Sequence, residues 1–250
     1  DVQSDPRVQE RFASGLIKCG RSKDALRILE GLPPAVRDRK SVISKRAQAY
    51  METGAYDAAI AQLQHLLALE PGNAATHLVI IRALALQGKL AEAECLIDEA
   101  NAAGQGSAAY LYERTKLENR RGNFSQQMFL LERLVADAPK VWKAWLDLAA
   151  LHLKRGNRDH ALWLLRKVPS DAPEYARAVA RMAGILGEMG EYSDAVAALR
   201  EVIGKAAEEP GSAVVAQDEG QLEACVCYLE ILSKSARLSE GKALIDDLLR

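Results

Sequence analysis

Apolar and polar positions along the chain repeat with a period of 34 residues, and a glycine marks each repeat. The glycines of this register are Gly20, Gly54, Gly88, Gly122, Gly156 and Gly190. Because the 250 residues include only 17 glycines, six of them at one spacing are not a chance alignment. Such a period predicts an array of equal structural units, each packed against its neighbours.

The residues on both sides of each glycine have helical spacing. Five residues after the glycine the side chain is small in five of six repeats: Ala25, Ala59, Ala93, Gln127, Ala161 and Ala195. Four and seven residues further on, the positions are almost all Leu, Ile or Val, which is one apolar face of a helix. Seven residues before the glycine, small residues recur at Ala13, Ala47, Ala149 and Ala183, with Ile81 and Thr115 in the other two repeats.

This pattern predicts two antiparallel helices that meet at a tight turn. Glycine supplies the positive φ that ends the first helix, and the facing alanines let the two backbones approach closely. Pro71, Pro139 and Pro173 each follow their glycine by 17 residues and are expected to end the second helix. Gln127 stands where alanine is usual, so we expect a looser helix pair in the fourth repeat.

In these positions the chain resembles the tetratricopeptide repeat family, whose 34-residue unit carries a W-x2-L-G-x2-Y, A-x3-F, P signature. The fifth repeat agrees at Trp145, Leu148, Ala149, His152, Gly156, Ala161, Leu165 and Pro173. The second agrees at Ala47, Tyr50, Gly54, Tyr56, Ala59, Leu63 and Pro71. The resemblance implies an all-α fold, a right-handed α-solenoid of about seven helix-turn-helix hairpins, and it covers about residues 6–207.

The register breaks after the sixth repeat. Ala236 takes the place of the turn glycine 46 residues after Gly190, so the connection is longer by about 12 residues. We therefore expect one continuous solenoid domain, with six repeats in residues 1–207. Residues 208–250 would form a long connection and a divergent seventh hairpin or cap, with helices at about 220–234 and 239–250.

Charge is balanced overall and uneven along the chain. The 33 basic and 34 acidic residues give a net charge of -1, which shows no general preference for nucleic acid or anionic membrane. By segment, residues 1–104 hold 13 basic and 13 acidic residues, 105–170 hold 12 and 6, and 171–250 hold 8 and 15. The segments thus carry charges of 0, +6 and -7, so a basic middle adjoins an acidic end.

The sequence contains no motif that predicts catalysis. Glycine-rich phosphate loops, nucleophile elbows and metal-ligand spacings of His or Cys are all missing. His152 and His160 are expected on opposite helices of one hairpin, a turn of the stack apart, with packing as their role. The four cysteines are interpreted as free thiols, because Cys225 and Cys227 would point to different sides of one helix. We therefore predict a protein that is not an enzyme and needs no cofactor or metal.

The resemblance also implies which residues bind a ligand. In the family, the first helices line a concave groove, and positions 2, 5, 9, 12 and 13 of each repeat point into it. Carried over by register, these positions predict a groove that mixes cations with apolar side chains, which suits an acidic peptide. The predicted groove residues are Arg82, Tyr112, Lys116, Asn119, Arg120, Lys143, Leu146, Lys154 and Arg177. The small residues Ala180, Gly184 and Gly187 of the sixth repeat are expected to leave room for a ligand.

Two further features concern the likeness to the family: a carboxylate clamp found in one subset, and the tryptophans of the fifth repeat. One subset of the family holds the C-terminal carboxylate of chaperones with Lys and Asn at positions 5 and 9 of one repeat. None of the repeats has this Lys and Asn pair; the fourth, for example, has Tyr112 and Lys116 at the two positions. The clamp is therefore absent. Of the tryptophans in the fifth repeat, Trp145 is expected to pack, whereas Trp142 is either packed or an exposed binding residue.

Our leading hypothesis is a protein-protein interaction scaffold that holds a peptide or partner subunit in its groove. The alternative is the non-catalytic repeat region of a larger enzyme, or of a bacterial envelope polysaccharide or secretion machine, where it would position a catalytic domain or polymer. Head-to-tail self-association through the +6 and -7 segments is also expected. Nucleic-acid binding is not, since the groove offers one aromatic, Tyr112. No run reaches the length of a membrane span, and we expect a cytoplasmic protein, or a periplasmic one after loss of an export signal.

Overall fold

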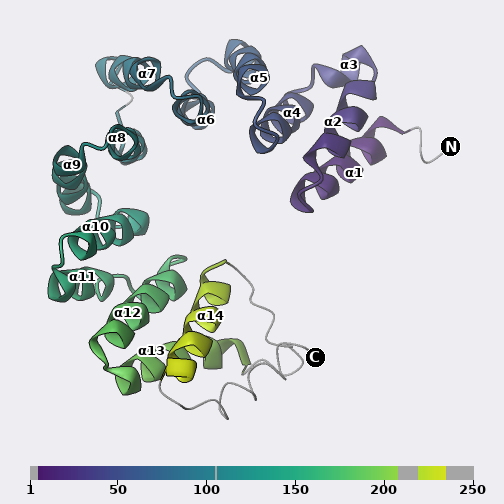
Figure 1. The fold of residues 1–250 in the computed structure, drawn as a ribbon. Helices are drawn as coiled ribbons and strands as arrows, with labels where there is room; N and C mark the ends of the chain where they lie inside the picture. The colour runs from purple at the N-terminus through teal and green to yellow at the C-terminus, as the bar shows by residue number, and fades with distance from the viewer. Residues whose placement is uncertain (1–4, 105, 208–218, 235–250) are drawn as a thin grey trace. The chain divides into compact units, whose positions relative to one another are not determined.

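The computed structural model describes residues 5–104, 106–207 and 219–234, and these form helices joined by short turns with no strand among them. Figure 1 shows successive helices lying side by side within residues 5–123 and, separately, within the described residues from 124 to 234. The helices are α1 (Pro6–Lys18), α2 (Ser22–Gly31), α3 (Pro34–Arg37), α4 (Lys40–Glu52), α5 (Tyr56–Leu69), α6 (Ala74–Leu86), α7 (Leu90–Ala102), α8 (Ala108–Arg121), α9 (Phe124–Asp137), α10 (Trp142–Lys154), α11 (Arg158–Leu165), α12 (Tyr175–Met189), α13 (Tyr192–Ala207) and α14 (Glu219–Lys234).

The turn glycines adopt the conformation that the sequence predicts. All six have a positive φ, from +72° at Gly20 to +84° at Gly190. At Gly122 the backbone N–H donates to the Asn119 carbonyl, and the next N–H, of Asn123, donates to the Glu118 carbonyl at 2.9 Å. These bonds satisfy carbonyls that the end of α8 would otherwise leave unpaired. The same 34-residue step therefore places a helix end and a reversal at each glycine.

The chain divides into two compact units, Asp1–Asn123 and Phe124–Arg250. In the first unit the alanines on both sides of the turns, such as Ala13 and Ala25, are fully buried. Two apolar clusters fill this unit, one around Leu29 in α1 to α4 and one around Ile81 and Ile97 in α4 to α8. Facing small residues thus let the paired helices approach, as the repeat pattern predicts.

The second unit follows the same rule. Ala149, Ala161, Ala183 and Ala195 are at most 2% exposed and lie where the helices of one hairpin meet. Gln127 is also buried, and no described residue hydrogen-bonds to its side-chain oxygen. A continuous solenoid from one unit to the next stays a prediction.

Two local features differ from the expected hairpins. α11 ends at Leu165, eight residues before Pro173, so Pro173 does not end this helix. Pro169 explains the early stop, because it lacks an N–H and disfavours helical backbone at the preceding Val168. A four-residue helix, α3, also lies between α2 and α4 in the first unit, and the repeat pattern does not predict it.

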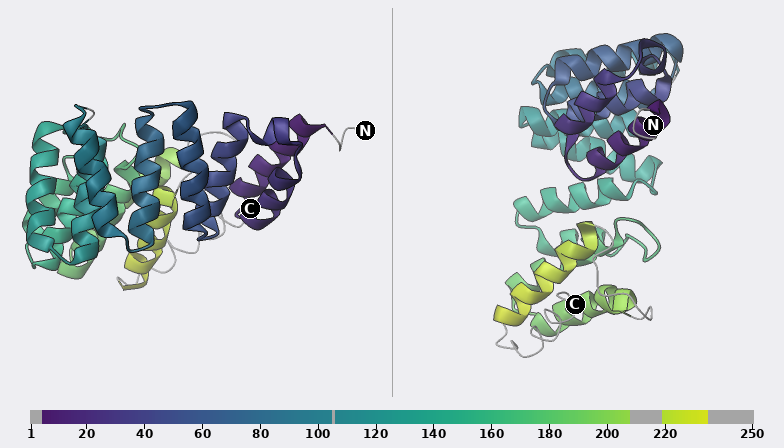
Figure 2. Two further views of the ribbon diagram at one scale, coloured as in Figure 1. Left: turned by 90° about the horizontal axis from the view of Figure 1, so that it is seen from above. Right: turned by 90° about the vertical axis from the view of Figure 1, so that its right-hand side faces the viewer.

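α14 begins at Glu219 and ends at Lys234, which confirms the first helix expected after the long connection. It packs against both α12 and α13, and in both views of Figure 2 the yellow α14 lies beside these green helices. The second expected helix, at 239–250, lies outside the described residues. Among the residues that the structure describes, no helix combines the length and apolar character that crossing a bilayer requires.

Candidate ligand-binding surface

The predicted groove residues of the first unit lie on α6 and α8, and an ion-pair cluster joins the two helices. Arg82 of α6 bonds to the Glu113 carboxylate of α8 at 2.6 Å, and Lys116 approaches the same oxygen at 3.2 Å. The Glu113 side chain is only 4% exposed, whereas those of Arg82 and Lys116 are 49% and 41% exposed. A buried carboxylate therefore holds two half-exposed cations in place.

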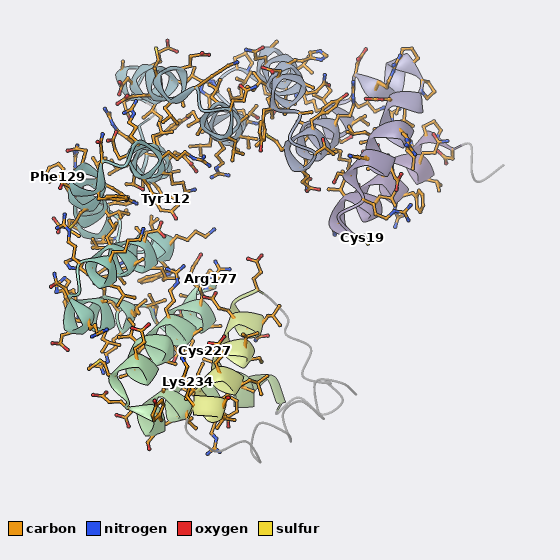
Figure 3. The ribbon with its side chains drawn as sticks, in the orientation of Figure 1. Cys19, Tyr112, Phe129, Arg177, Cys227 and Lys234 are labelled. Atoms are coloured by element: carbon orange, nitrogen blue, oxygen red, sulfur yellow. The ribbon has the colours of Figure 1, made fainter. Side chains whose placement is uncertain are left out.

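The rest of this surface is cationic and partly apolar. The ammonium of Lys116 lies 4.4 Å from the centre of the Tyr112 ring, and Asn119 and Arg120 are exposed at the end of α8. Leu86 of α6 is 43% exposed. We call the set Arg82, Tyr112, Lys116, Asn119 and Arg120 the α8 face; Figure 3 labels Tyr112 on it. The structure thus brings Arg82 and Lys116 together around one buried carboxylate, and Tyr112, Asn119 and Arg120 lie on the same helix as Lys116.

In the second unit, two predicted cations are exposed on α10. The ammonium of Lys143 lies 4.0 Å from the Glu174 carboxylate, and that of Lys154 lies 5.4 Å from the centre of the Phe124 ring. Leu146 is 3% exposed and its carbonyl accepts from Arg181. The expectation that Leu146 lines an open groove is therefore wrong, because neighbouring helices cover it.

Arg177 of α12 is exposed in part but already bound. Its guanidinium pairs with Glu219 at 2.9 Å and with Glu223 at 3.2 Å, both on α14 (Figure 3). The Cys227 thiol contacts the Ala180 carbonyl, and a Cβ on Gly187 would lie 3.4 Å from Ile231. Ala180 and Gly187 are buried, so α14 occupies the room that the small residues of the sixth repeat were expected to leave.

The exposed side of α14, which borders Ala180 of α12, is a surface that sequence reasoning missed. Leu222 is 54% exposed and Val226 49%, and together with Glu219, Glu223 and Glu230 they line a shallow depression. We call these five residues the α14 face. The signal was available in the sequence, because the i, i+4 spacing of the two apolar side chains places them on one side of a helix among carboxylates.

The tryptophans divide between packing and exposure. Trp145 donates its indole N–H to the Pro139 carbonyl at 2.9 Å, in line with a packing role, and Trp142 is half-buried. Trp163 is 49% exposed, with the Lys167 ammonium 4.8 Å from the centre of its ring. The exposed indole of the fifth repeat is therefore Trp163, on the second helix, and not Trp142.

The two histidines of the fifth repeat are in contact. Their ring centres lie 4.2 Å apart, so the expectation that a turn of the stack separates them is wrong. His152 and His160 each stand four residues from Gly156, and the reversal there brings them together. Burial and the neighbouring His160 lower the pKa of His152. No group of three His, Cys, Asp or Glu suited to a metal occurs among the described residues.

The cysteines are free thiols in the described structure. Cys19 and Cys95 are exposed, and Cys225 is buried. Burial, with Glu230 and Glu223 adding to it, raises the pKa of Cys227 to about 11. This thiol therefore stays protonated at neutral pH and is a weak nucleophile.

Comparison with known proteins agrees with this architecture. Residues 50–117 match the model of the tetratricopeptide repeat family. A tetratricopeptide repeat protein from Parabacteroides merdae shares the fold with a TM-score of 0.59 at 16% identity, over 88% of this chain and 84% of that one. PilW, a widely conserved type IV pilus biogenesis factor, has a TM-score of 0.53 at 17% identity, over 87% of this chain and 96% of that one. The human IFIT1 dimer with PPP-AAAA has a TM-score of 0.50 at 14% identity, over 93% of this chain and 60% of that one. No curated protein matches the sequence.

These likenesses establish the fold, and the residues that carry it are the turn glycines and facing alanines described above. Repeats of this fold typically serve as non-catalytic scaffolds for protein interactions. The chain is therefore an all-α protein that shares its fold with tetratricopeptide repeat structures, and the family model matches residues 50–117 directly.

Proposed function

We propose that the chain is a non-catalytic interaction scaffold that binds an acidic, partly apolar segment of a partner protein on the α8 face. The single observation that carries this proposal is the buried Glu113 with Arg82 and Lys116 around it. One carboxylate neutralises only one of the two cations, and Arg120 adds a third. The surface therefore has uncompensated positive charge at fixed positions, which favours a carboxylate-bearing ligand.

The apolar part of the ligand has a place on the same surface. Leu86 is 43% exposed, and the ring of Tyr112 lies beneath the Lys116 ammonium. Apolar contact supplies affinity, whereas the cations select the partner and speed its encounter. Within the second unit, Lys143 and Lys154 of α10 are also exposed cations.

The test is fluorescence anisotropy with a labelled peptide of Glu and Leu residues, beside a peptide in which every Glu is Gln. The variant combines Lys116→Gln with Arg120→Glu and keeps Arg82, so that Glu113 retains an ion pair. Its matched control combines Lys23→Gln with Arg27→Glu on α2, where both side chains are exposed. We expect about tenfold weaker binding of the acidic peptide by the variant, which is about 1.4 kcal/mol.

The control should bind as the wild type does, and neither protein should favour the Gln peptide. Equal loss in both variants would mean that net charge, not the α8 face, governs binding. Unchanged affinity of the Lys116 and Arg120 variant would refute the assignment of this face.

A second candidate function is a repeat region that positions other components of an envelope assembly. It is favoured by the fold shared with the type IV pilus biogenesis factor over 87% of this chain. This function requires the full-length gene product to reach the cell envelope. Fractionation of native cells tests it, and recovery of the protein wholly in the cytoplasm would exclude it.

A further inference from the structure

No helix of the described residues covers the α14 face, which combines two apolar side chains with carboxylates. Leu222 and Val226 are about half exposed, at 54% and 49%, on successive turns of α14. Glu219 and Glu223 hold Arg177, whereas Glu230 is exposed one turn beyond Val226. A partner for this face must therefore cover two apolar side chains and present positive charge.

The environment of Cys227 gives independent support for the negative character of this surface. Cys227 lies on the same helix, and its pKa is raised to about 11 by burial and by the charges of Glu230 and Glu223. Glu230 and Glu223 both contribute to this increase in pKa, and Lys234, one turn beyond Glu230, opposes it. A cationic partner would lower the electrostatic energy of this cluster.

The chain itself contains a surface of the complementary kind. The α8 face has Arg82, Lys116 and Arg120, and Leu86 is exposed beside it on α6. The same asymmetry holds in the sequence, since residues 105–170 carry +6 and residues 171–250 carry -7. Every copy of the protein thus carries one apolar surface with cations and one with carboxylates.

We propose that the α14 face of one copy docks on the α8 face of a second copy, so that the protein assembles head to tail. This inference rests on the proposed function, because it names an occupant for the α8 face. The two surfaces differ, and the contact is therefore heterologous, which produces rings or open chains rather than a closed symmetric dimer. A free acidic partner would compete with this assembly for the α8 face.

Sedimentation velocity of the full chain tests the assembly. At low salt the weight-average mass should rise with protein concentration above the monomer mass. In about 1 M salt the Debye length falls to about 3 Å, and the association constant should drop at least tenfold. A monomer mass at every concentration in low salt would overturn the proposal.

Charge exchange identifies the two surfaces. Glu230→Lys is the variant of choice on α14, because Glu219 and Glu223 also hold Arg177 and their loss would disturb the helix. Glu230→Lys and Arg120→Glu should each weaken association about tenfold. An equimolar mixture of the two variants should recover association, because the intact α8 face of the first can bind the intact α14 face of the second, and the new lysine and glutamate attract each other as well. Failure of the mixture to recover would contradict the pairing.

Two measurements separate this proposal from the proposed function. Glu92→Lys on α7 makes the same change in net charge as Glu230→Lys and should associate as the wild type does. At protein concentrations where the wild type is monomeric, Glu230→Lys should bind the acidic peptide with wild-type affinity, because its α8 face is intact. If the wild-type protein binds the acidic peptide but stays monomeric, self-assembly alone is overturned. If it neither binds the peptide nor associates, the proposed function is overturned as well.

Discussion

At the scale of single residues, the contribution of a glycine to stability depends on its backbone conformation. Gly190 ends α12 with φ +84°, and Gly184 lies inside the same helix with ordinary helical backbone. A Cβ added at either position meets no atom within 4 Å. Steric space is therefore equal at the two sites, and any difference between their alanine variants must come from the backbone.

We predict opposite effects for Gly190→Ala and Gly184→Ala. The first should lower the free energy of unfolding by about 1–2 kcal/mol, because alanine is strained at positive φ. The second should raise it by about 0.5–1 kcal/mol, because alanine favours helix over glycine. Urea unfolding followed by circular dichroism measures both. Equal signs for the two variants would show that the turn glycine is not needed for its φ.

On the candidate surface, the position of a residue in the repeat predicts its exposure in some cases and fails in others. Position in the repeat correctly placed Lys116 and Arg120 on the exposed side of α8. It could not show that Glu113, at a position not expected to face the groove, is buried and holds Arg82 and Lys116. Leu146 was misplaced because burial depends on what a neighbouring helix covers, and that information is not local to α10.

At the scale of helices, charged side chains join successive repeats. Glu94 of α7 binds both Arg114 and Arg121 of α8, and Arg114 also binds Asp98. The hydrogen bond from Arg121 lowers the pKa of Glu94 below the ordinary value of 4.5. The pairing therefore stabilises the folded state once Glu94 is ionised.

We predict that Glu94→Gln destabilises the protein in a pH-dependent way. Because the folded pKa lies below the unfolded one, the contribution is complete above about pH 4.5 and is lost as the pH falls through the folded pKa. At neutral pH the loss should be about 1 kcal/mol, since these side chains are a quarter to a third exposed. Urea midpoints at pH 7 and pH 3 measure it, with Glu92→Gln as a control that should change neither value. A deficit that does not shrink as the pH falls would contradict the ionic origin.

The contact of α14 with α12 can be followed through thiol chemistry. Cys19 and Cys95 are exposed, and Cys227 is held against the Ala180 carbonyl with a pKa of about 11. We expect a disulfide reagent at pH 8 to modify Cys19 and Cys95 first and Cys227 much later. Arg177→Ala removes two ion pairs to α14 and should speed modification of Cys227 several-fold, as peptide mapping by mass spectrometry would show. Cys95 is the internal control, and an unchanged Cys227 rate would mean that Arg177 does not help to hold α14.

At the scale of the whole molecule, each unit has its own buried apolar side chains. Ile97 in the first unit and Leu199 in the second are both fully buried. In a repeat array each hairpin is stabilised by its neighbours, so distant sites are expected to behave independently. A cavity in one unit should then leave the other largely unaffected.

We predict that Ile97→Ala and Leu199→Ala each cost about 2–4 kcal/mol in their own unit. Hydrogen exchange with mass spectrometry should show faster exchange in α6 to α8 for the first variant and in α12 to α14 for the second. Protection lost uniformly along the chain in either variant would instead show that the two units unfold as one.

The amino-acid sequence by itself determined the repeat, because turn glycines and facing alanines act within one hairpin and need only local spacing to be recognised. It also determined the all-α class and the end of the regular register near residue 207, since a break in spacing is visible without coordinates. Only the tertiary structure decided which groove positions stay open. α14 covers Ala180 and Gly187 and binds Arg177, and such coverage depends on how a helix far along the chain packs, which no periodic pattern encodes.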